Sequence, residues 1–369
     1  MGPKLPRRLA EHPSVRAVLA ARAVSGTEAG TEAGAEAAPP PPIDAAWLRE
    51  LCLRAGADDA AAVGLDHPDL AGEREHVLHA LPGARTLVSL VVRMNRDDVR
   101  SAARSVANQE FHRAGELVND AARTVVRALE DAGHRAVNPS ATFPMEMEHF
   151  PGRIWVVAHK TVAVAAGLGV MGLHRNVIHP RYGSFVLLAT LLLDAEVSAY
   201  GEPLDYNPCV DCKLCVAACP VGAITKDGDF DFLACATHNY REFMAGFTDW
   251  VQTVADSEDA ADFRGRVTDA ENASMWQSLA FKPSYKAAYC LAVCPAGEDV
   301  LGPYLDDRRH FMDTVLRPLQ EKTETLYVLP GSRAREYAER RFPHKPVKEV
   351  SGGWSAPAPT AGRRDPDRR

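Results

Sequence analysis

The feature that most constrains this chain is a run of four cysteines in the sequence CVDCKLCVAACP, which spans Cys209 to Pro220. Successive cysteines are separated by two, two and three residues, and a proline follows the last one. This is the ligand spacing of bacterial 4Fe–4S sites, in which three close thiolates hold one cluster and the fourth serves a second cluster. Zinc sites use paired Cys-x2-Cys sequences and gain nothing from this spacing. The run therefore predicts iron–sulfur chemistry.

A second cysteine pair lies further along the chain and supplies partners for the first run. Cys290 and Cys294 are separated by three residues, and Pro295 follows them. By the pseudo-symmetry of two-cluster ferredoxins, one cluster is expected on four cysteines: Cys209, Cys212, Cys215 and Cys294. Cys219 and Cys290 then belong to a second cluster.

This second cluster lacks one cysteine. A full second motif would carry a cysteine three residues before Cys290, and that position is Ala287. Cys235, sixteen residues after Cys219, brings the thiolates to three. The fourth corner is left to His238, a carboxylate, water or nothing, so a 4Fe–4S or a 3Fe–4S cluster is expected. The remaining cysteine, Cys52, recurs with apolar residues at helical spacing and is predicted to lie in the core.

Composition divides the 369 residues into four parts. Residues 1–42 include SGTEAGTEAGAEAAPPPP, which lacks large apolar side chains and predicts a disordered tail. Residues 43–200 mix helices and strands, so the fold class is α+β. Residues 201–305 form a ferredoxin-like 4Fe–4S domain with a polar, helical insert at 236–289. Residues 306–369 are expected to be a C-terminal extension whose tail after Phe342 is loose.

Periodicity places the elements of the first domain. Asp44 is a plausible N-cap for a helix over 45–56. The apolar run at 85–94 predicts a buried strand, and 185–193 predicts another. A long amphipathic helix is expected over 108–133, with Leu117, Ala121, Val125 and Leu129 on one face.

Charge and hydropathy narrow the expected partners. The formal net charge is −7, so nucleic acid is expected to be an unlikely partner. No stretch of about 18 apolar residues predicts a membrane span. No secretory signal is read at the start, and clustered cysteines are typical of metal chemistry in a reducing compartment. The expected location is cytoplasmic.

The segment from Ala163 to Asp194, followed by the cysteine run, resembles the epoxyqueuosine reductase and reductive dehalogenase superfamily. Those proteins have a helix ending in Ala-Gly-Leu-Gly, a glycine-containing turn, an apolar strand ending near Asp, and a two-cluster ferredoxin module. Here the counterparts are Ala166–Gly169, Gly172 and the strand that ends at Asp194. The family's lone cysteine after the first Cys-Pro corresponds to Cys235.

The resemblance implies a nitroreductase-like domain that holds a corrinoid (cobalamin), with clusters that pass electrons to cobalt. The expected cofactor-binding residues lie around the glycine turn: Gly167, Gly169, Gly172, His174, Arg175 and Asn176. The glycines permit close approach of a flat ligand, but a helix stop followed by a tight turn explains them equally well. Weak catalytic candidates are His159, at a helix start, and Tyr182, since a tyrosine can serve as a general acid.

The chain also differs from the epoxyqueuosine reductases. Those enzymes carry an acidic proton donor fourteen residues before the glycine of the helix end, and this chain has Arg153 there. Glu146 and Glu148 are the nearest acids, in a different local context. The insert between Cys235 and Cys290 is longer than in the tRNA-modifying enzymes.

Three hypotheses follow for function. The first is an iron–sulfur oxidoreductase that passes electrons to a corrinoid and reduces a small organic substrate, with ferredoxin or flavodoxin as electron donor. The second is an iron–sulfur electron-transfer protein without corrinoid. The third is a tRNA-modifying enzyme like epoxyqueuosine reductase. In the first, the insert with Trp250, Trp276 and Phe281 is expected to fold over the cofactor cavity as a lid.

Overall fold

The computed structural model describes residues 11–24, 41–149 and 152–351. It divides into two units, Met1–Pro41 and Pro42–Arg369. In the first unit, helix α2 spans Pro13–Val24, where the sequence predicted disorder. Proline at the first helical position and an alanine-rich sequence favour this helix. The low-complexity repeat falls on 25–40 and lies outside the described residues.

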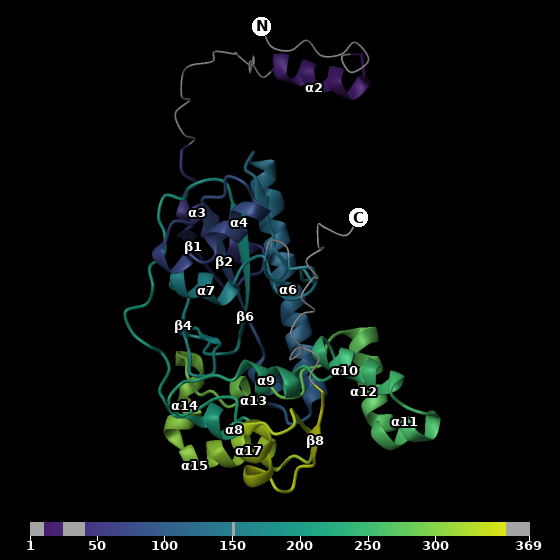
Figure 1. The fold of residues 1–369 in the computed structure, drawn as a ribbon. Helices are drawn as coiled ribbons and strands as arrows, with labels where there is room; N and C mark the ends of the chain where they lie inside the picture. Colours follow the sequence, from purple (N-terminus) through teal and green to yellow (C-terminus); the bar gives the residue numbers. More distant parts are fainter. Residues whose placement is uncertain (1–10, 25–40, 150–151, 352–369) are drawn as a thin grey trace, which may run out of the picture. The chain divides into compact units, whose positions relative to one another are not determined.

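The second unit is built on a four-stranded antiparallel sheet in the order β1-β2-β6-β3 (Figure 1). The strands are β1 (Asp59–Gly64), β2 (Thr86–Arg93), β3 (Ala136–Val137) and β6 (Val186–Leu193). Strands β2 and β6 pair along their whole length, from Thr86 opposite Leu193 to Arg93 opposite Val186. They are the two apolar strands that the sequence predicted.

Helices cover both faces of this sheet, which explains why β2 is apolar at successive positions rather than alternating. Four helices form the two covering layers: α3 (Ala45–Arg54), α4 (Arg74–Ala80), α6 (Arg104–Asp131) and α7 (His159–Ala165). On one face, Val88 and Leu90 pack with α3 and α6. On the other face, Leu87 packs with α4 and α7. The short elements nearby are η1 (Pro68–Leu70), α5 (Arg96–Arg100), β4 (Val170–Met171) and β5 (Val177–Ile178).

Three local predictions for α3 and α6 can be compared with the structure, and two of them are confirmed without change. The Asp44 side chain accepts a hydrogen bond of 2.7 Å from the Trp47 N–H and caps α3, as predicted. Cys52 is fully buried in the core, also as predicted. The prediction for Leu117 was wrong, because its side chain is 40% exposed and Val118 is buried in its place. Ala121, Val125 and Leu129 are buried as predicted, so the stripe differs from the prediction only at its first position.

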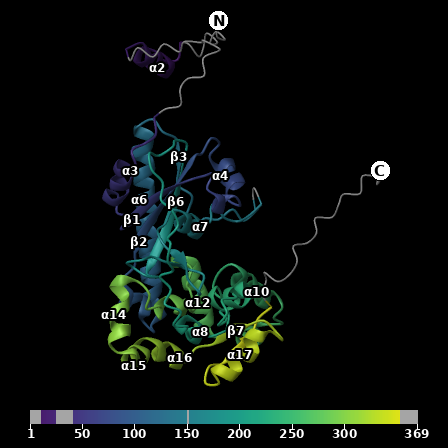
Figure 2. The ribbon, with the colours of Figure 1, turned by 90° about the vertical axis from the view of Figure 1, so that its left-hand side faces the viewer.

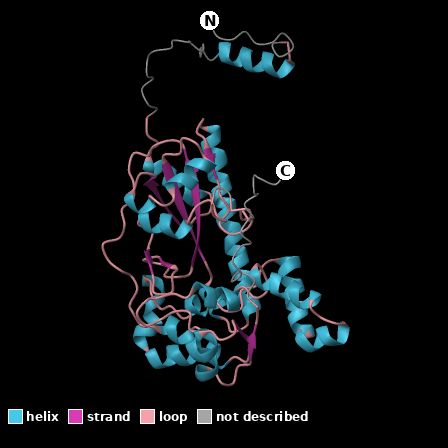
Figure 3. Ribbon diagram, in the orientation of Figure 1, coloured by secondary structure: helices cyan, strands magenta, loops and turns pink. Residues whose placement is uncertain are grey.

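Beyond β6 the chain consists mainly of helices and loops (Figure 3). Short helices α8 (Leu214–Ala218) and α13 (Tyr289–Ala292) carry cysteines, and the insert contains α9 (Phe232–Asn239), α10 (Ala245–Ala255), α11 (Ala260–Arg266) and α12 (Asp269–Phe281). The remaining elements are α14 (Glu298–Asp306), α15 (Arg308–Phe311), the π-helical η2 (Met312–Leu316), α16 (Arg317–Glu321), β7 (Leu326–Val328), α17 (Arg333–Arg341) and β8 (Val347–Glu349). Strand β8 pairs with β7 in parallel. The expectation of a loose chain after Phe342 was therefore wrong for the stretch to β8, because backbone pairing orders it.

A continuous core joins the sheet to the cysteine-containing part of the chain. The cluster of buried side chains that includes β2, β6 and α6 also includes Tyr289 and Ala292 of α13. Asn108 of α6 exchanges two hydrogen bonds with the backbone of Tyr285, at 2.8 and 3.1 Å. Figures 1 and 2 show α6 running beside the sheet and onward to this part of the chain. Across the described ranges, every helix is too short or too polar to cross a membrane.

Candidate iron–sulfur sites and the adjoining cavity

Three cysteines of the first run and the distant Cys294 surround one small cavity. The cavity measures about 10 Å³ and is lined by Cys209, Cys212, Cys215 and Cys294, with His174 beside them. Burial raises the pKa of the Cys294 thiol to about 12 and also raises that of Cys215. The thiols of Cys294 and Cys215 are therefore protonated at neutral pH, and iron must displace those protons when it binds.

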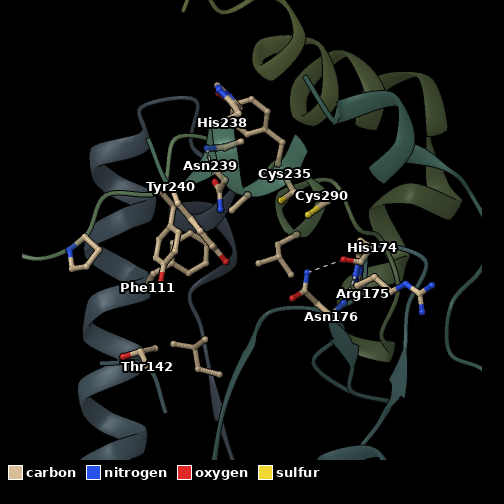
Figure 4. Close-up of a pocket in the computed structure, with 18 of the residues that line it drawn as sticks. Phe111, Thr142, His174, Arg175, Asn176, Cys235, His238, Asn239, Tyr240 and Cys290 are labelled. Atoms are coloured by element: carbon tan, nitrogen blue, oxygen red, sulfur yellow. Dashed lines mark hydrogen bonds between the residues drawn. The ribbon is translucent and has the colours of Figure 1, made fainter. Parts of the chain in front are cut away.

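The other three cysteines line a much larger cavity, of about 800 Å³ (Figure 4). Cys219 follows α8, Cys235 lies in α9 and Cys290 lies in α13. The Cys219 sulfur accepts a hydrogen bond of 3.2 Å from the Ala223 N–H, which fixes the turn after the Cys-Pro pair. Ala287 lines the same cavity. Cys219, Cys235 and Cys290 thus open onto the large cavity, while the assignment of the seven cysteines to two clusters stays a prediction.

The large cavity lies between α6 and the cysteine-containing helices. One wall is a face of α6 that carries Phe111, His112, Gly115, Glu116, Asn119 and Asp120. Tyr240 and Tyr285 form an aromatic wall, with ring centroids 6.0 Å apart. Sequence reasoning missed the α6 wall, although the polar residues at 112, 116 and 120 recur at helical spacing within an amphipathic helix.

A polar edge closes the opposite side of this cavity. Lys160 donates hydrogen bonds to the Arg175 carbonyl oxygen, at 2.9 Å, and to Asn176 Oδ1, at 2.6 Å. Burial lowers the pKa of Lys160, and the nearby Cys290 and Cys235 partly offset that effect. His174 Nδ1 accepts the Asn176 N–H at 3.1 Å, so its proton lies on Nε2. That buried Nε2 has no partner among the described residues.

The residues expected around a cofactor divide into two sets. His174, Arg175 and Asn176 line the large cavity (Figure 4). The three glycines do not. A side chain at Gly167 would place its Cβ 2.2 Å from the Glu202 oxygen, and Gly167 has a φ of +77°. The glycines therefore meet the packing needs of the chain's own backbone, which agrees with the helix-stop and tight-turn interpretation.

The two weak catalytic candidates lie outside the cavity lining. Both ring nitrogens of His159 are engaged at 3.0 Å, with Thr190 Oγ1 and with the Ser140 carbonyl oxygen. Tyr182 is buried, and its ring stacks on His179 with centroids 4.7 Å apart. Neither side chain is placed to reach a ligand in the cavity.

Arg153, which stands where the resemblance leads one to expect an acid, belongs to a structural ion pair. Its guanidinium donates two hydrogen bonds to Glu73, one of 2.9 Å and a shorter one. Glu73 also accepts the Ala158 N–H at 2.8 Å, at the start of α7. Burial alone would raise the pKa of Glu73, but the hydrogen bonds from Arg153 and Ala158 outweigh it and lower the pKa. The pair anchors the entry to α7.

The expectation that the insert covers the cavity with its aromatic residues was wrong. Trp276 and Phe281 are 61% and 67% exposed, and neither lines the large cavity. Trp250 donates from Nε1 to Asn272 at 2.9 Å and holds α10 to α12. The cavity is lined instead by the two ends of the insert, at 235–240 and 282–289. The middle of the insert therefore packs on itself, since the Trp250 side chain of α10 is bonded to Asn272 of α12.

No three Cys, His, Asp or Glu side chains converge as ligands of a single metal ion within the described ranges. A 4Fe–4S cluster distributes its thiolates over several irons, and the family evidence favours this kind of site. The model of the 4Fe-4S binding domain family matches residues 202–225, which contain all four cysteines of the first run. This family match supports iron–sulfur binding by residues 202–225.

Curated proteins similar to this chain are named epoxyqueuosine reductase. The protein of Cyclobacterium marinum is 28% identical over 167 residues, which are 42% of this chain and 48% of that protein. The protein of Leadbetterella byssophila is 42% identical over 84 residues, 22% of this chain and 27% of its own length. That of Gloeobacter violaceus is 26% identical over 47% of this chain and 51% of its own length. The chain thus spans about half or less of these relatives, and the matches confirm the resemblance to their superfamily.

Solved structures of two kinds are similar to the chain. Epoxyqueuosine reductase from Streptococcus thermophilus aligns with a TM-score of 0.39 and 15% identity, over 74% of this chain and 79% of that one. A catabolic reductive dehalogenase aligns with a TM-score of 0.44 and 15% identity, over 73% and 34%. An epoxyqueuosine reductase bound to a modified tRNA-Tyr stem loop aligns with a TM-score of 0.39 and 17% identity, over 84% and 76%.

These relatives overturn one prediction. Net charge suggested that nucleic acid is an unlikely partner, but the similar curated proteins are named for a reaction on epoxyqueuosine, which is a nucleoside of tRNA. A formal charge of −7 summed over the chain does not describe the local potential at one cavity. The exclusion of nucleic acid was therefore wrong.

Proposed function

We propose that this chain is an iron–sulfur reductase that acts on an epoxyqueuosine-like nucleoside in tRNA. Reduction of an epoxide to an alkene consumes two electrons and two protons and releases water. The observation that carries the proposal is the opening of the second cysteine group onto a cavity of about 800 Å³, a volume typical of sites for large ligands. The names of the similar curated proteins supply the substrate class.

The donor set fits two clusters. We propose the ligands Cys209, Cys212, Cys215 and Cys294 for one cluster, since four thiols around a small cavity match an all-cysteine site. For the second cluster we propose Cys219, Cys235 and Cys290. When bound, the clusters supply single electrons.

We also propose that the large cavity holds a corrinoid. Its aromatic wall suits a flat ring, and its polar edge offers groups for a polar periphery. The unpartnered Nε2–H of His174 is a donor that such a ligand would satisfy. When bound, a corrinoid supplies a strongly reducing metal centre, while Lys160 and Asn176 orient the polar periphery and Phe111 and Tyr240 exclude water.

The remaining expectations belong to this proposal as well. The resemblance implies that the sheet domain is nitroreductase-like, and its support is an antiparallel sheet covered on both faces. The division into parts at residues 42, 200 and 305 also remains a proposal.

Complementation tests the reaction. The chain would be expressed in a bacterial strain that lacks epoxyqueuosine reductase, and tRNA nucleosides would be measured by liquid chromatography and mass spectrometry. We expect queuosine to return with the wild type and with Cys52→Ala, and epoxyqueuosine to remain with Cys290→Ala. Epoxyqueuosine that persists with iron-replete wild-type protein would contradict the proposal.

Cobalamin binding is tested separately by anaerobic equilibrium dialysis. We expect micromolar or tighter binding, weakened roughly tenfold by Asn176→Ala through the loss of one hydrogen bond. Glu75→Gln, an exposed position on α4, is the matched control and should bind as the wild type does. Absence of binding by iron-replete protein would leave the reductase without this cofactor.

A further inference from the structure

The backbone around Ala287 repeats the backbone around Cys212. Lys213, which follows Cys212, has a left-handed φ of +60°, and Ala288, which follows Ala287, has a φ of +53°. Each residue immediately precedes a short helix, α8 or α13, whose second residue is a cysteine. A left-handed conformation at a non-glycine residue costs about 1 kcal/mol or more. The second turn keeps this costly shape but has a methyl group where the first turn has a thiol.

Two polar side chains of the cavity lining, Asn239 and Lys160, have partners within the chain. The side-chain oxygen of Asn239 (Oδ1) accepts a hydrogen bond of 2.9 Å from the Ala287 N–H. The oxygen of the Asn239 side-chain amide is therefore already in use. Lys160 is bonded to Arg175 and Asn176. The amide nitrogen of Asn239 therefore remains as a donor beside the position that lacks a thiol.

His238, the protein ligand suggested by the sequence, lines the large cavity, and its Nε2 has no partner among the described residues. Its Nδ1 accepts the Tyr327 N–H at 3.3 Å, and its ring stacks on Tyr327 with centroids 6.3 Å apart. Figure 4 shows this ring pointing away from Cys235 and Cys290, whereas Asn239 extends into the cavity. Ala287 lines the cavity with a methyl group where a full motif would carry a thiol, and the His238 ring points away from Cys235 and Cys290.

We propose that Ala287 leaves one iron of the second cluster without a protein thiolate, and that this iron takes an exchangeable oxygen-donor ligand from the cavity, such as water or a carboxylate, positioned by the Asn239 amide nitrogen. The inference rests on the cluster assignment of the proposed function. It goes further by naming an open coordination position, the residue that creates it and the ligand class that it takes. Oxygen donors suit an iron that has lost a soft thiolate to a wet cavity.

The test uses the anaerobically purified full chain and reads iron directly. Under mild ferricyanide oxidation, we expect the wild type to lose one iron per chain and to show the paramagnetic signal of a 3Fe–4S cluster. Ala287→Cys should retain that iron, because the backbone already has the shape that presents Cys212. Ala288→Ser, which keeps the turn and adds no thiol, is the matched control and should behave as the wild type does.

Water labelled with oxygen-17 tests the open position itself. We expect magnetic coupling to the reduced second cluster in the wild type and its loss in Ala287→Cys. Acetate should compete with the labelled water, and Asn239→Leu should raise the required acetate concentration roughly tenfold. A wild type that keeps all its iron and shows no oxygen-17 coupling overturns the inference, because a protein side chain then closes the corner. These measurements do not depend on turnover, so they remain interpretable if the tRNA reaction fails. A measured content of one cluster per chain would contradict the cluster assignment on which both proposals rest.

Discussion

At the residue scale, the chain holds two kinds of buried cysteine that a chemical test can separate. Cys52 is packed among apolar side chains, and burial raises its pKa to about 12. Cys212 lines the small cavity with three other cysteines. We expect Cys212→Ser to lose the first cluster, about half of the bound iron, and Cys52→Ala to keep all of it. Iron analysis of purified protein measures both, and equal iron loss in the two variants would contradict the assignment.

The ion pair of Glu73 and Arg153 gives a pH-dependent prediction. The folded-state pKa of Glu73 is lowered, so its stabilisation is present above the unfolded pKa and is lost as pH falls through the folded one. We expect Glu73→Gln to lower the free energy of unfolding by about 2 kcal/mol or more near pH 7, since it leaves a buried guanidinium without its charge partner. The difference should shrink in acid.

Chemical denaturation across that pH range measures this effect. Glu75→Gln on the same helix is the control, because Glu75 is exposed and should change stability little at any pH. If the free energy of unfolding of Glu73→Gln stays below that of the wild type by the same amount into strong acid, the charge of Glu73 is not the cause of the difference.

Sequence alone predicted iron–sulfur binding by the first cysteine run, because thiolate spacing in such a motif is set by the cluster, and the family match agrees. The division of the seven cysteines between two clusters stays a prediction. The cavity walls were not predictable, because Phe111 and Tyr240 come from distant helices whose meeting depends on tertiary packing. Gly167 was misleading because two different requirements both select glycine. A glycine needed to make room for the Glu202 backbone oxygen cannot be told from sequence alone from a glycine that makes room for a ligand.

At the scale of elements, a buried arginine connects the insert to the strands β7 and β8. Arg241 pairs with Asp249 of α10 and with Glu271 of α12, at 2.5 and 2.8 Å. Lys348 of β8 also pairs with Glu271, at 2.7 Å. This network of ion pairs therefore holds α10 and α12 against each other and against β8, although the outer faces of both helices are exposed.

We expect Arg241→Ala to destabilise the insert by about 3–5 kcal/mol, because it leaves buried carboxylates without their main charge partner. Hydrogen exchange should then be faster throughout α10 to α12 while the β2–β6 pair remains protected. Arg266→Ala removes an exposed i,i+4 pair with Asp262 and is the control, with little expected change. Unchanged protection of the insert in Arg241→Ala would contradict this role.

Element-scale prediction was most accurate for elements with strong apolar patterns. β2, β6 and α6 were located to within a few residues because each buries a long apolar face. β8 was missed because three residues in a polar, basic stretch carry little pattern of their own, and pairing with β7 supplies their order.

At the scale of the whole molecule, the shared core makes one unit of what sequence divides into domains. Side chains of β2, β6, α6 and α13 belong to one buried cluster. We expect removal of iron by a chelator to lower the melting temperature of the whole Pro42–Val350 region rather than to melt only the cysteine-containing part. Calorimetry of holo and iron-free protein measures this, and a sheet transition that does not move would contradict it.

The pairing of Cys294 with the first cysteine run has a consequence during protein synthesis. Cys294 follows Cys215 by 79 residues, so at about 5–20 residues per second the ribosome takes roughly 4–16 s to add it. Throughout that interval three thiols stand without their fourth partner, and the sheet lacks the α13 side chains that complete its core. A nascent chain in this state is open to oxidation and to the capture of other metals, so on the proposed ligand assignment we expect cluster insertion to follow translation of the last Cys-Pro turn.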